Sequence, residues 1–178
     1  MPTIVSHAAV PLALGVGLGE KRIPRTLLVA GIAASMLPDA DVILTTFGAS
    51  YDSVWSHRGV THSIAFALLA AAVALVLLRR LAPALIVFAF LFIATASHGL
   101  LDMLTNGGHG VALFWPVTDQ RYFFHWHPIQ VAPLVTHDFV QRFANRAAAL
   151  ARTEGLWIWV PAAIVATALR TIRKGAAQ

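Results

Sequence analysis

The sequence predicts an all-α fold: a polytopic helical membrane bundle with about four to five membrane-embedded helices. Of the 178 residues, 58% are hydrophobic and only 12% are charged, whereas soluble domains carry about a quarter charged residues. The mean hydropathy is +0.72, and the long apolar runs are bounded by basic clusters. The chain therefore lacks the polar side chains that would cover a surface facing water.

Composition excludes several other classes of protein. One domain is expected at this length, and the high apolar content excludes intrinsic disorder. Because the chain has no cysteine, any metal must bind through histidine and carboxylate. The formal charge of +5 does not indicate a nucleic-acid partner, since the basic residues sit at the ends of apolar runs and not on one solvated face.

Five apolar segments follow one another along the chain. Two of them, Gly59 to Leu78 and Leu81 to Leu101, reach the length of about 20 residues that a bilayer crossing needs. The segments at 8–19, 26–37 and 156–169 are short for a full crossing and could be tilted, half-buried or re-entrant. No basic residue precedes the first segment, so we expect it to be retained and not cleaved as a signal peptide.

The stretch between Asp102 and Glu154 differs in composition from the rest of the chain. Its prolines and its Gly107-Gly108 pair predict an irregular loop, followed by an amphipathic helix at about 138–153 in which arginines interleave with apolar residues. That pattern is typical of a helix lying at a membrane surface. A C-terminal helix is expected at about 156–170. The whole chain, 1–178, is expected to form one domain with its core motifs in 7–125.

The charge distribution predicts the topology. Basic clusters at 21–25, 79–80 and 170–174 fall on one side of the membrane if the segments cross alternately, and the positive-inside rule makes that side cytoplasmic. Seven of the eight acidic residues and all eight histidines then lie toward the extracytoplasmic end: Asp39, Asp41, Asp52, Asp102, Asp119, Asp138 and Glu154, with His7, His57, His62, His98, His109, His125, His127 and His137.

His98 and Asp102 lie four residues apart at the end of a long apolar segment. This spacing places both side chains on one helical face, where they can share one ligand. Ionisable groups near hydrocarbon are costly and are therefore functional candidates. The alternative is an aspartate at the water interface beside a hydrogen-bonded histidine.

The HRGVTHS sequence at 57–63 adds two imidazoles. A spacing of five would place His57 and His62 on different faces of a continuous helix. We therefore expect His57 in the preceding loop and either Thr61 or Ser63 as the helix cap, so that the two rings can converge.

The PDAD sequence at 38–41 ends the second segment. Proline stops or bends a helix, so Asp39 and Asp41 can point into one site, or can simply anchor the helix at the interface. A bound cation would offset the unfavourable helix dipole. With His7, the candidate ligands exceed the three of a typical catalytic zinc, which indicates two or three ions. Zinc, manganese and iron all suit such donors.

The ordered pattern of His7, PDAD, HRGVTHS, SHGLLD at 97–102 and LFWP at 113–116 resembles the YdjM family of bacterial inner-membrane proteins, described as metal-dependent hydrolases. The resemblance extends to about residue 125. That family is remotely similar to zinc-dependent phospholipase C and the S1/P1 nucleases, although their HxxxE step has no counterpart here. The resemblance implies metal roles for His7, Asp39 or Asp41, His57 or His62, His98 and Asp102.

Together these features predict a multi-pass hydrolase of the bacterial inner membrane that acts through a metal-activated water. Its expected substrates are phosphate esters of lipids or lipid-linked molecules, and zinc is the favoured ion. Asp39 or Asp41 is the candidate general base, and Arg58, like Arg121, is a candidate phosphate ligand that could instead anchor lipid headgroups. The loop histidines His109, His125 and His127 are further candidate ligands or part of an anchoring belt.

Two other functions stay open at this stage. A divalent-metal transporter or sensor would place ionisable groups along a path through the membrane, whereas here they collect at one end. A structural membrane protein would use the same side chains for hydrogen bonds between helices, and it would contain no stoichiometric transition metal.

Overall fold

Helices account for all the regular secondary structure in residues 1–43, 53–133 and 138–176, the parts of the chain that the computed structural model describes. No strand occurs within these ranges. Two isolated bridges, Thr105 with Ile129 and Val111 with Tyr122, tie the long loop to itself and to the end of a helix. The predicted all-α class is confirmed.

The helical elements lie close to the expected segments. In chain order they are η1 (Ile4–Ala8), α1 (Ala9–Leu18), α2 (Arg25–Met36), η2 (Leu37–Asp41), η3 (Val60–His62), α4 (Ile64–Leu78), α5 (Ala84–Met103), α6 (Phe139–Glu154), η4 (Gly155–Trp159) and α7 (Val160–Gly175). Short 3-10 turns (η1, η2 and η3) adjoin α1, α2 and α4 at one end of the bundle, and η4 is a π-helical turn.

Two helices are long and apolar enough to cross a membrane: Ala84–Met103, and the continuous helix Phe139–Gly175. The helices Ile4–Leu18 and Ile64–Leu78 are apolar but shorter. The expectation of four to five membrane-embedded helices therefore exceeds what helix length supports.

The segment from Gly59 to Leu78 contains a shorter helix than its apolar composition indicates. The hydroxyl of Ser63 accepts a hydrogen bond from the Phe66 N–H at 3.0 Å, so α4 begins only at Ile64. The prediction of a cap at Thr61 or Ser63 is confirmed for Ser63. The preceding residues form the turn that carries His57 and His62.

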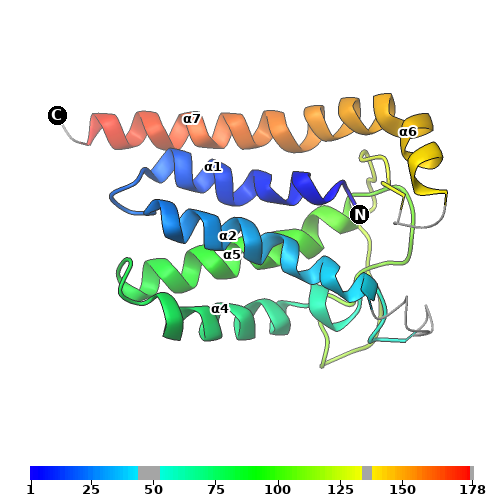
Figure 1. Ribbon diagram of the computed structural model, residues 1–178, viewed down its shortest axis with the longest axis horizontal. Coiled ribbons are helices and arrows are strands. Elements are labelled where there is room, and N and C mark those ends of the chain that lie inside the picture. The colour runs from blue at the N-terminus through cyan, green and yellow to red at the C-terminus, as the bar shows by residue number, and fades with distance from the viewer. Residues whose placement is uncertain (44–52, 134–137, 177–178) are drawn as a thin grey trace.

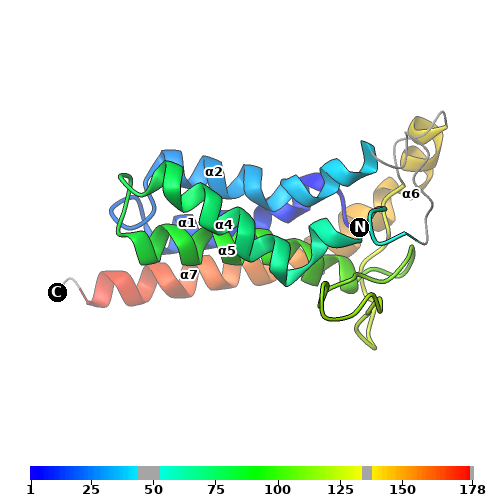
Figure 2. The same ribbon diagram turned by 90° about the horizontal axis from the view of Figure 1, so that it is seen from below.

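The expected surface helix at 138–153 and the last apolar segment are joined without a break. Gly155 keeps helical dihedral angles (φ −54°, ψ −52°), so a π-helical turn connects α6 to α7 in place of a loop. A π-turn inserts an extra residue into the helix and is a recognised cause of bending. The α6 segment bends away from the axis of α7 at that point (Figure 1, Figure 2).

The helices run side by side along one long axis (Figure 1). α5 packs against both α2 and α4, and α1 packs against α7. The core between α2, α4 and α5 is formed by apolar side chains such as Leu27, Phe90 and Leu91. The loops after α1 and α4 and the end of α7, which carry the basic clusters, lie at one end of the bundle, and the 3-10 turns and the long loop lie at the other.

Gly17 permits the close approach of α1 to α7. A Cβ atom built on Gly17 would lie 2.7 Å from the Cβ of Leu169 and 3.2 Å from the backbone oxygen of Ala166. Gly155 is also helical, but nothing lies within 4 Å of a Cβ built there.

We predict that Gly17→Ala destabilises the protein by about 1–3 kcal/mol because the two helices must move apart. Both substitutions gain the helix propensity of alanine, so Gly155→Ala is the matched control and is expected to be neutral or stabilising. Thermal unfolding in detergent, followed by tryptophan fluorescence, measures the difference. Equal Tm values for the two variants would contradict this packing argument.

Candidate metal centre

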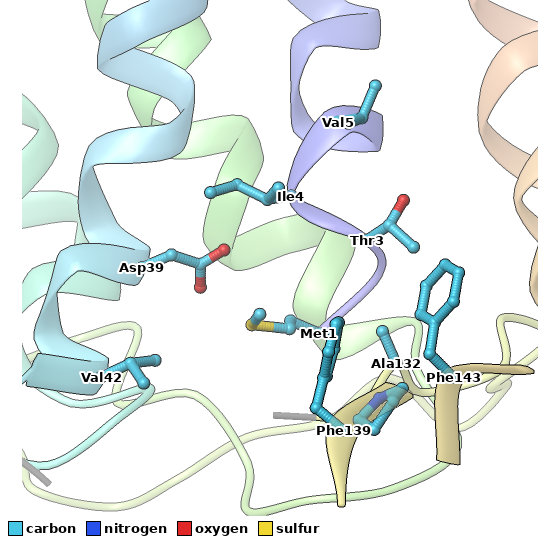
Figure 3. Close-up of a pocket in the computed structure, with 10 residues that line it drawn as sticks. Met1, Thr3, Ile4, Val5, Asp39, Val42, Ala132, Phe139 and Phe143 are labelled. Carbon is cyan, nitrogen blue, oxygen red and sulfur yellow. The ribbon is translucent and has the colours of Figure 1, made fainter. Parts of the chain in front are cut away.

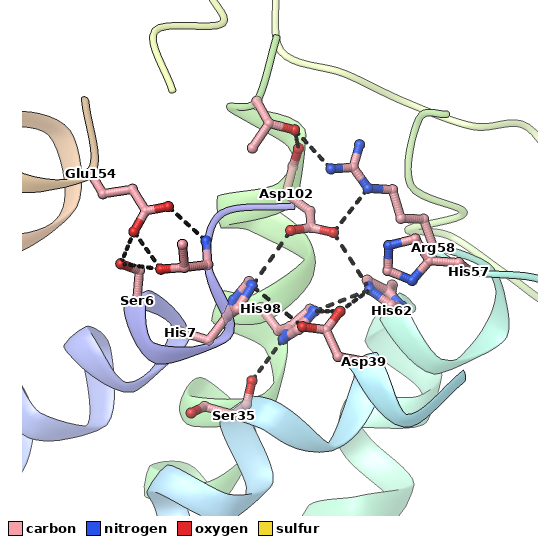
Figure 4. A network of polar contacts seen from close by, with 12 residues as sticks. Ser6, His7, Ser35, Asp39, His57, Arg58, His62, His98, Asp102 and Glu154 are labelled. Atoms are coloured by element: carbon pink, nitrogen blue, oxygen red, sulfur yellow. Dashed lines mark hydrogen bonds and ion pairs between the residues drawn. The ribbon is translucent and has the colours of Figure 1, made fainter. Parts of the chain in front are cut away.

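Five ligand-type side chains meet at the end of the bundle that carries the 3-10 turns (Figure 4). They come from four elements: His7 from η1, Asp39 from η2, His62 from η3, and His98 and Asp102 from α5. All five are buried, and His7, His98 and Asp102 have no exposed surface. Residues up to 95 positions apart in the sequence therefore share one interior space.

Local structure explains how each side chain arrives there. The four-residue spacing in α5 puts His98 and Asp102 on one face, as the sequence predicted. A 3-10 turn that contains Pro38 follows α2 and carries Asp39. Gly99 lets η3 approach α5 closely, because a Cβ atom there would lie 2.6 Å from the backbone oxygen of His62.

The distances between the donor atoms suit coordination of an ion. The Nε2 atom of His62 lies 3.0 Å from Nε2 of His98 and 3.5 Å from Oδ2 of Asp102. Asp39 Oδ1 lies 3.3 Å from His98 Nε2, and His7 Nε2 lies 3.6 Å from Asp102 Oδ1. Donors on one tetrahedral zinc, with bonds of about 2.0–2.1 Å, are about 3.3 Å apart.

Three sets of residues could each hold a metal ion, with donor atoms that lie within 4.8 Å of one another. They are His7, Asp39 and His98; Asp39, His57 and His62; and His62, His98 and Asp102. Because the sets share members, the geometry is compatible with more than one ion.

Several of these buried polar atoms have no hydrogen bond. Within the described parts of the chain, neither ring nitrogen of His7 has a hydrogen-bond partner. The carboxylate oxygens of Asp39 and Asp102 meet no hydrogen-bond criterion either, and their contacts include ion pairs with His98, His62 and Arg58 at 3.0–3.5 Å. Buried polar groups are nearly always paired, because an unpaired one costs several kcal/mol.

The buried carboxylates of Asp39, Asp41 and Asp102 outnumber the buried cationic groups beside them, which are the Arg58 guanidinium and the His62 ring with its raised pKa. Burial lowers the pKa of the nearby Met1 α-amino group to about 6, so the site keeps an excess of negative charge that suits a cation.

Outer contacts orient the histidines. The Nδ1–H of His98 donates to the backbone oxygen of Ser35 at 2.7 Å, which leaves the Nε2 lone pair toward the cluster. Metal-ligating histidines typically have such a contact. Asp41 lies behind the rings: its Oδ1 is 2.8 Å from His57 Nδ1, and its Oδ2 is 3.2 Å from His62 Nδ1.

The protonation states of His57 and His62 follow from these contacts. Burial alone would lower the pKa of His62, but the carboxylates of Asp102 and Asp41, which lie 3.5 and 3.2 Å from its ring nitrogens, raise it to about 9. Burial lowers the pKa of His57 despite its hydrogen bond to Asp41, so its ring is neutral at pH 7. The carboxylates at the centre of the cluster therefore favour a positive charge on His62, whereas His57 at the edge keeps a neutral ring.

Arg58 is buried, and its guanidinium contacts Asp102 and the loop that follows α5. Its Nε lies 3.0 Å from Oδ2 of Asp102. Its terminal nitrogens donate to the Thr105 hydroxyl at 2.8 Å and to the backbone oxygens of Gly107 and His109 at 3.1 and 2.9 Å. Four of its five N–H groups are directed at Asp102 and the adjacent loop, which favours a positioning role for Arg58 over the expected contact with substrate phosphate.

Arg121 is committed in a similar way. It donates to the backbone oxygens of Ser53, His57 and Gly110 at 2.9–3.2 Å. These contacts hold the turn that precedes η3 against the long loop. The geometry favours a positioning role for Arg121 over the expected contact with phosphate.

The loop histidines lie outside the cluster. His109, His125 and His127 are exposed, and none belongs to the ligand sets that the described residues form. The ring of His127 packs edge-on against Phe123. Asp52 and His137, which were counted with the residues of this end, lie outside the described residues.

Glu154, for which the sequence predicted no role, holds η1 against the last helix. Its carboxylate accepts hydrogen bonds from the Thr3 N–H at 2.6 Å, and from the hydroxyls of Thr3 and Ser6 at 2.5 Å each. Ser6 directly precedes His7, so this contact ties the histidine-bearing turn to the last helix. The sequence offered one signal for this role: Glu154 is an acidic residue placed between the amphipathic segment at 138–153 and the apolar segment at 156–169.

Comparisons with known proteins identify one matching family and one similar protein. The family described as YdjM inner membrane protein matches residues 1–177. Inner membrane protein YbcI of Escherichia coli (strain K12) is 42% identical over 163 residues, which cover 90% of this chain and 92% of that protein. No solved structure matches.

We predict that Glu154→Gln destabilises the protein by about 1.5–3 kcal/mol, since it replaces a buried carboxylate that accepts three short hydrogen bonds. Asp138→Asn is the control: its ion pair with Arg142 is largely exposed, and such pairs contribute at most about 1 kcal/mol. Thermal unfolding of both variants in detergent tests this. A loss at Asp138 as large as that at Glu154 would refute the anchoring role.

Proposed function

Because the chain belongs to the YdjM family of inner membrane proteins, we propose that its buried His/Asp cluster binds divalent metal and that the protein is a membrane-bound metal-dependent hydrolase. The observation that carries this proposal is the set of five buried donors, with several donor-to-donor distances of 3.0–3.6 Å, among which both ring nitrogens of the fully buried His7 have no hydrogen bond. A structural network would satisfy a buried imidazole of this kind.

The proposed ligands are His7, Asp39, His62, His98 and Asp102, with His57 at the edge. Zinc is the favoured ion, and manganese and iron accept the same donors. When bound, such an ion polarises an ester oxygen and lowers the pKa of a coordinated water toward 7. Asp41 holds the rings of His57 and His62 in place, as outer-shell carboxylates do at metal sites.

Asp39 is the proposed proton acceptor. Although burial alone would raise the pKa of Asp39, its contact with the His98 ring at 3.3 Å lowers it, so the carboxylate is ionised at neutral pH. Its oxygens border both the cluster and a cavity. General bases in this position typically contribute about 10²–10⁴-fold to a rate.

The proposed substrates are phosphate esters of lipids or lipid-linked molecules, and the proposed site faces the extracytoplasmic side of a multi-pass bundle. The basic loops at the opposite end support this orientation through the positive-inside rule. The cluster end carries the exposed tryptophans Trp55, Trp126 and Trp157, and tryptophan is enriched where proteins meet the membrane interface. A substrate anchored in the bilayer would reach such a site directly.

The alternative function, divalent-metal transport or sensing, would use the same cluster. It requires a polar path from the cluster to the basic end of the bundle. In the parts of the chain that are described, that region is filled by apolar side chains such as Leu27, Val87 and Phe90. This packing favours a hydrolase over a transporter.

We predict that protein purified without chelator contains stoichiometric transition metal, and that His98→Ala and Asp102→Ala abolish it. His127→Ala, which removes an exposed imidazole, is the matched control and should retain the metal. Elemental analysis by mass spectrometry measures the content. Full metal loading in either cluster variant would refute that ligand assignment.

We further predict chelator-sensitive release of phosphate from phosphate-ester lipids, reduced at least about 10²-fold in Asp39→Asn. The measurement uses protein in lipid nanodiscs with and without re-added zinc. Zinc or manganese uptake into proteoliposomes, without hydrolysis under the same conditions, would favour the transport alternative instead.

A further inference from the structure

An apolar cavity of about 400 Å³ lies beside the candidate metal centre (Figure 3). It is enclosed by η1, η2, the end of the long loop and α6. Its apolar lining includes Ile4, Val5, Val42, Ala132, Phe139 and Phe143. Asp39 contributes the one charged side chain among its lining residues.

Asp39 joins the cavity to the cluster. Its side chain is only 4% exposed, and its carboxylate points toward the cavity in Figure 3. The same carboxylate lies 3.3 Å from Nε2 of His98 and 3.9 Å from Nε2 of His7. A molecule in the cavity would therefore have one end beside the proposed metal ligands.

The chemistry of the walls selects the occupant. Cavities of about 300–1,000 Å³ are typical of small-molecule sites, and a polar ligand in an apolar cavity would lose hydrogen bonds to water without replacing them. Ile4 and Val5 are 47% and 60% exposed, so the cavity reaches the surface beside η1. An aliphatic chain can enter from that side.

We propose that this cavity binds one alkyl chain of an amphiphilic substrate and thereby places the anionic head of that substrate at the His/Asp cluster. The inference rests on the proposed function, because an anionic head beside Asp39 requires a bound cation. It adds the substrate class: an amphiphile in which one alkyl chain is attached directly to the phosphate-bearing group.

A second cavity provides an internal control. It lies against α5 and is lined by Val10, Leu100, Leu101, Phe124 and Trp126, among others. Its lining includes His125, which lies outside the ligand sets of the described residues, and no member of the His/Asp cluster. Leu100 in this cavity and Phe143 in the first are exposed to a similar degree, 42% and 37%, so truncation of each to alanine makes a matched pair.

The test is the binding of n-alkylphosphonates with one to ten carbons to zinc-loaded protein in lipid nanodiscs, measured by calorimetry and corrected with protein-free nanodiscs. Each added methylene should tighten binding about fourfold, which corresponds to about 0.8 kcal/mol per buried CH₂, until the cavity is full. Phe143→Ala should weaken octylphosphonate about fivefold to tenfold and leave methylphosphonate unchanged. Leu100→Ala should change neither.

A second variant, Ala132→Leu, fills part of the cavity. It should shorten the range of chain lengths over which affinity rises. This variant provides the test if Phe143→Ala does not fold. If methylphosphonate binds but corrected affinity does not rise with chain length, the alkyl-chain proposal is overturned and the proposed metal function stands. Equal losses in the Phe143 and Leu100 variants overturn it as well. Absence of metal overturns the proposed function itself.

Discussion

The burial of three carboxylates beside a single guanidinium is the constraint on which the structure of this protein depends. Asp39, Asp41 and Asp102 are withdrawn from water at one end of an apolar bundle, where unpaired charge is expensive. Arg58 offsets one of them through its contact with Asp102. The histidines that surround the remaining carboxylates could supply nitrogens to the divalent cation that we propose for this site.

Around the cluster, a layer of polar contacts holds the ends of the helices in register. Arg58 takes an uncommon positive φ of 68° and bonds the loop after α5, while Arg121 bonds the turn before η3. Glu154 fastens η1 to the last helix. Each of these side chains is charged, and each is used to position backbone near the donors. The positions of the donors are therefore determined by contacts between segments and not by any one helix.

The membrane setting and the proposed chemistry are linked by geometry. The helices that reach membrane length are covered by apolar side chains, and only 6% of the most apolar window of Phe139–Gly175 is buried inside the protein. The cluster sits where these helices end, beside exposed tryptophans and an apolar cavity. A site built in this way can meet a substrate whose chain is apolar and whose head is charged.

The sequence by itself determined the helical class, the order of the segments, the sidedness of charge and the shared face of His98 and Asp102, because these depend on residue type and on spacing within one element. It also identified the seven residues that meet in the polar network. It did not separate Asp39, which faces the cluster, from Asp41, which holds the histidine rings, nor did it show that Arg58 is already engaged. The clamp by Glu154, the fusion of α6 with α7 and the cavity beside Asp39 were decided by tertiary structure alone. Their contacts join residues as far apart as Thr3 and Glu154, and local periodicity carries no information about which distant side chains will share an interior space.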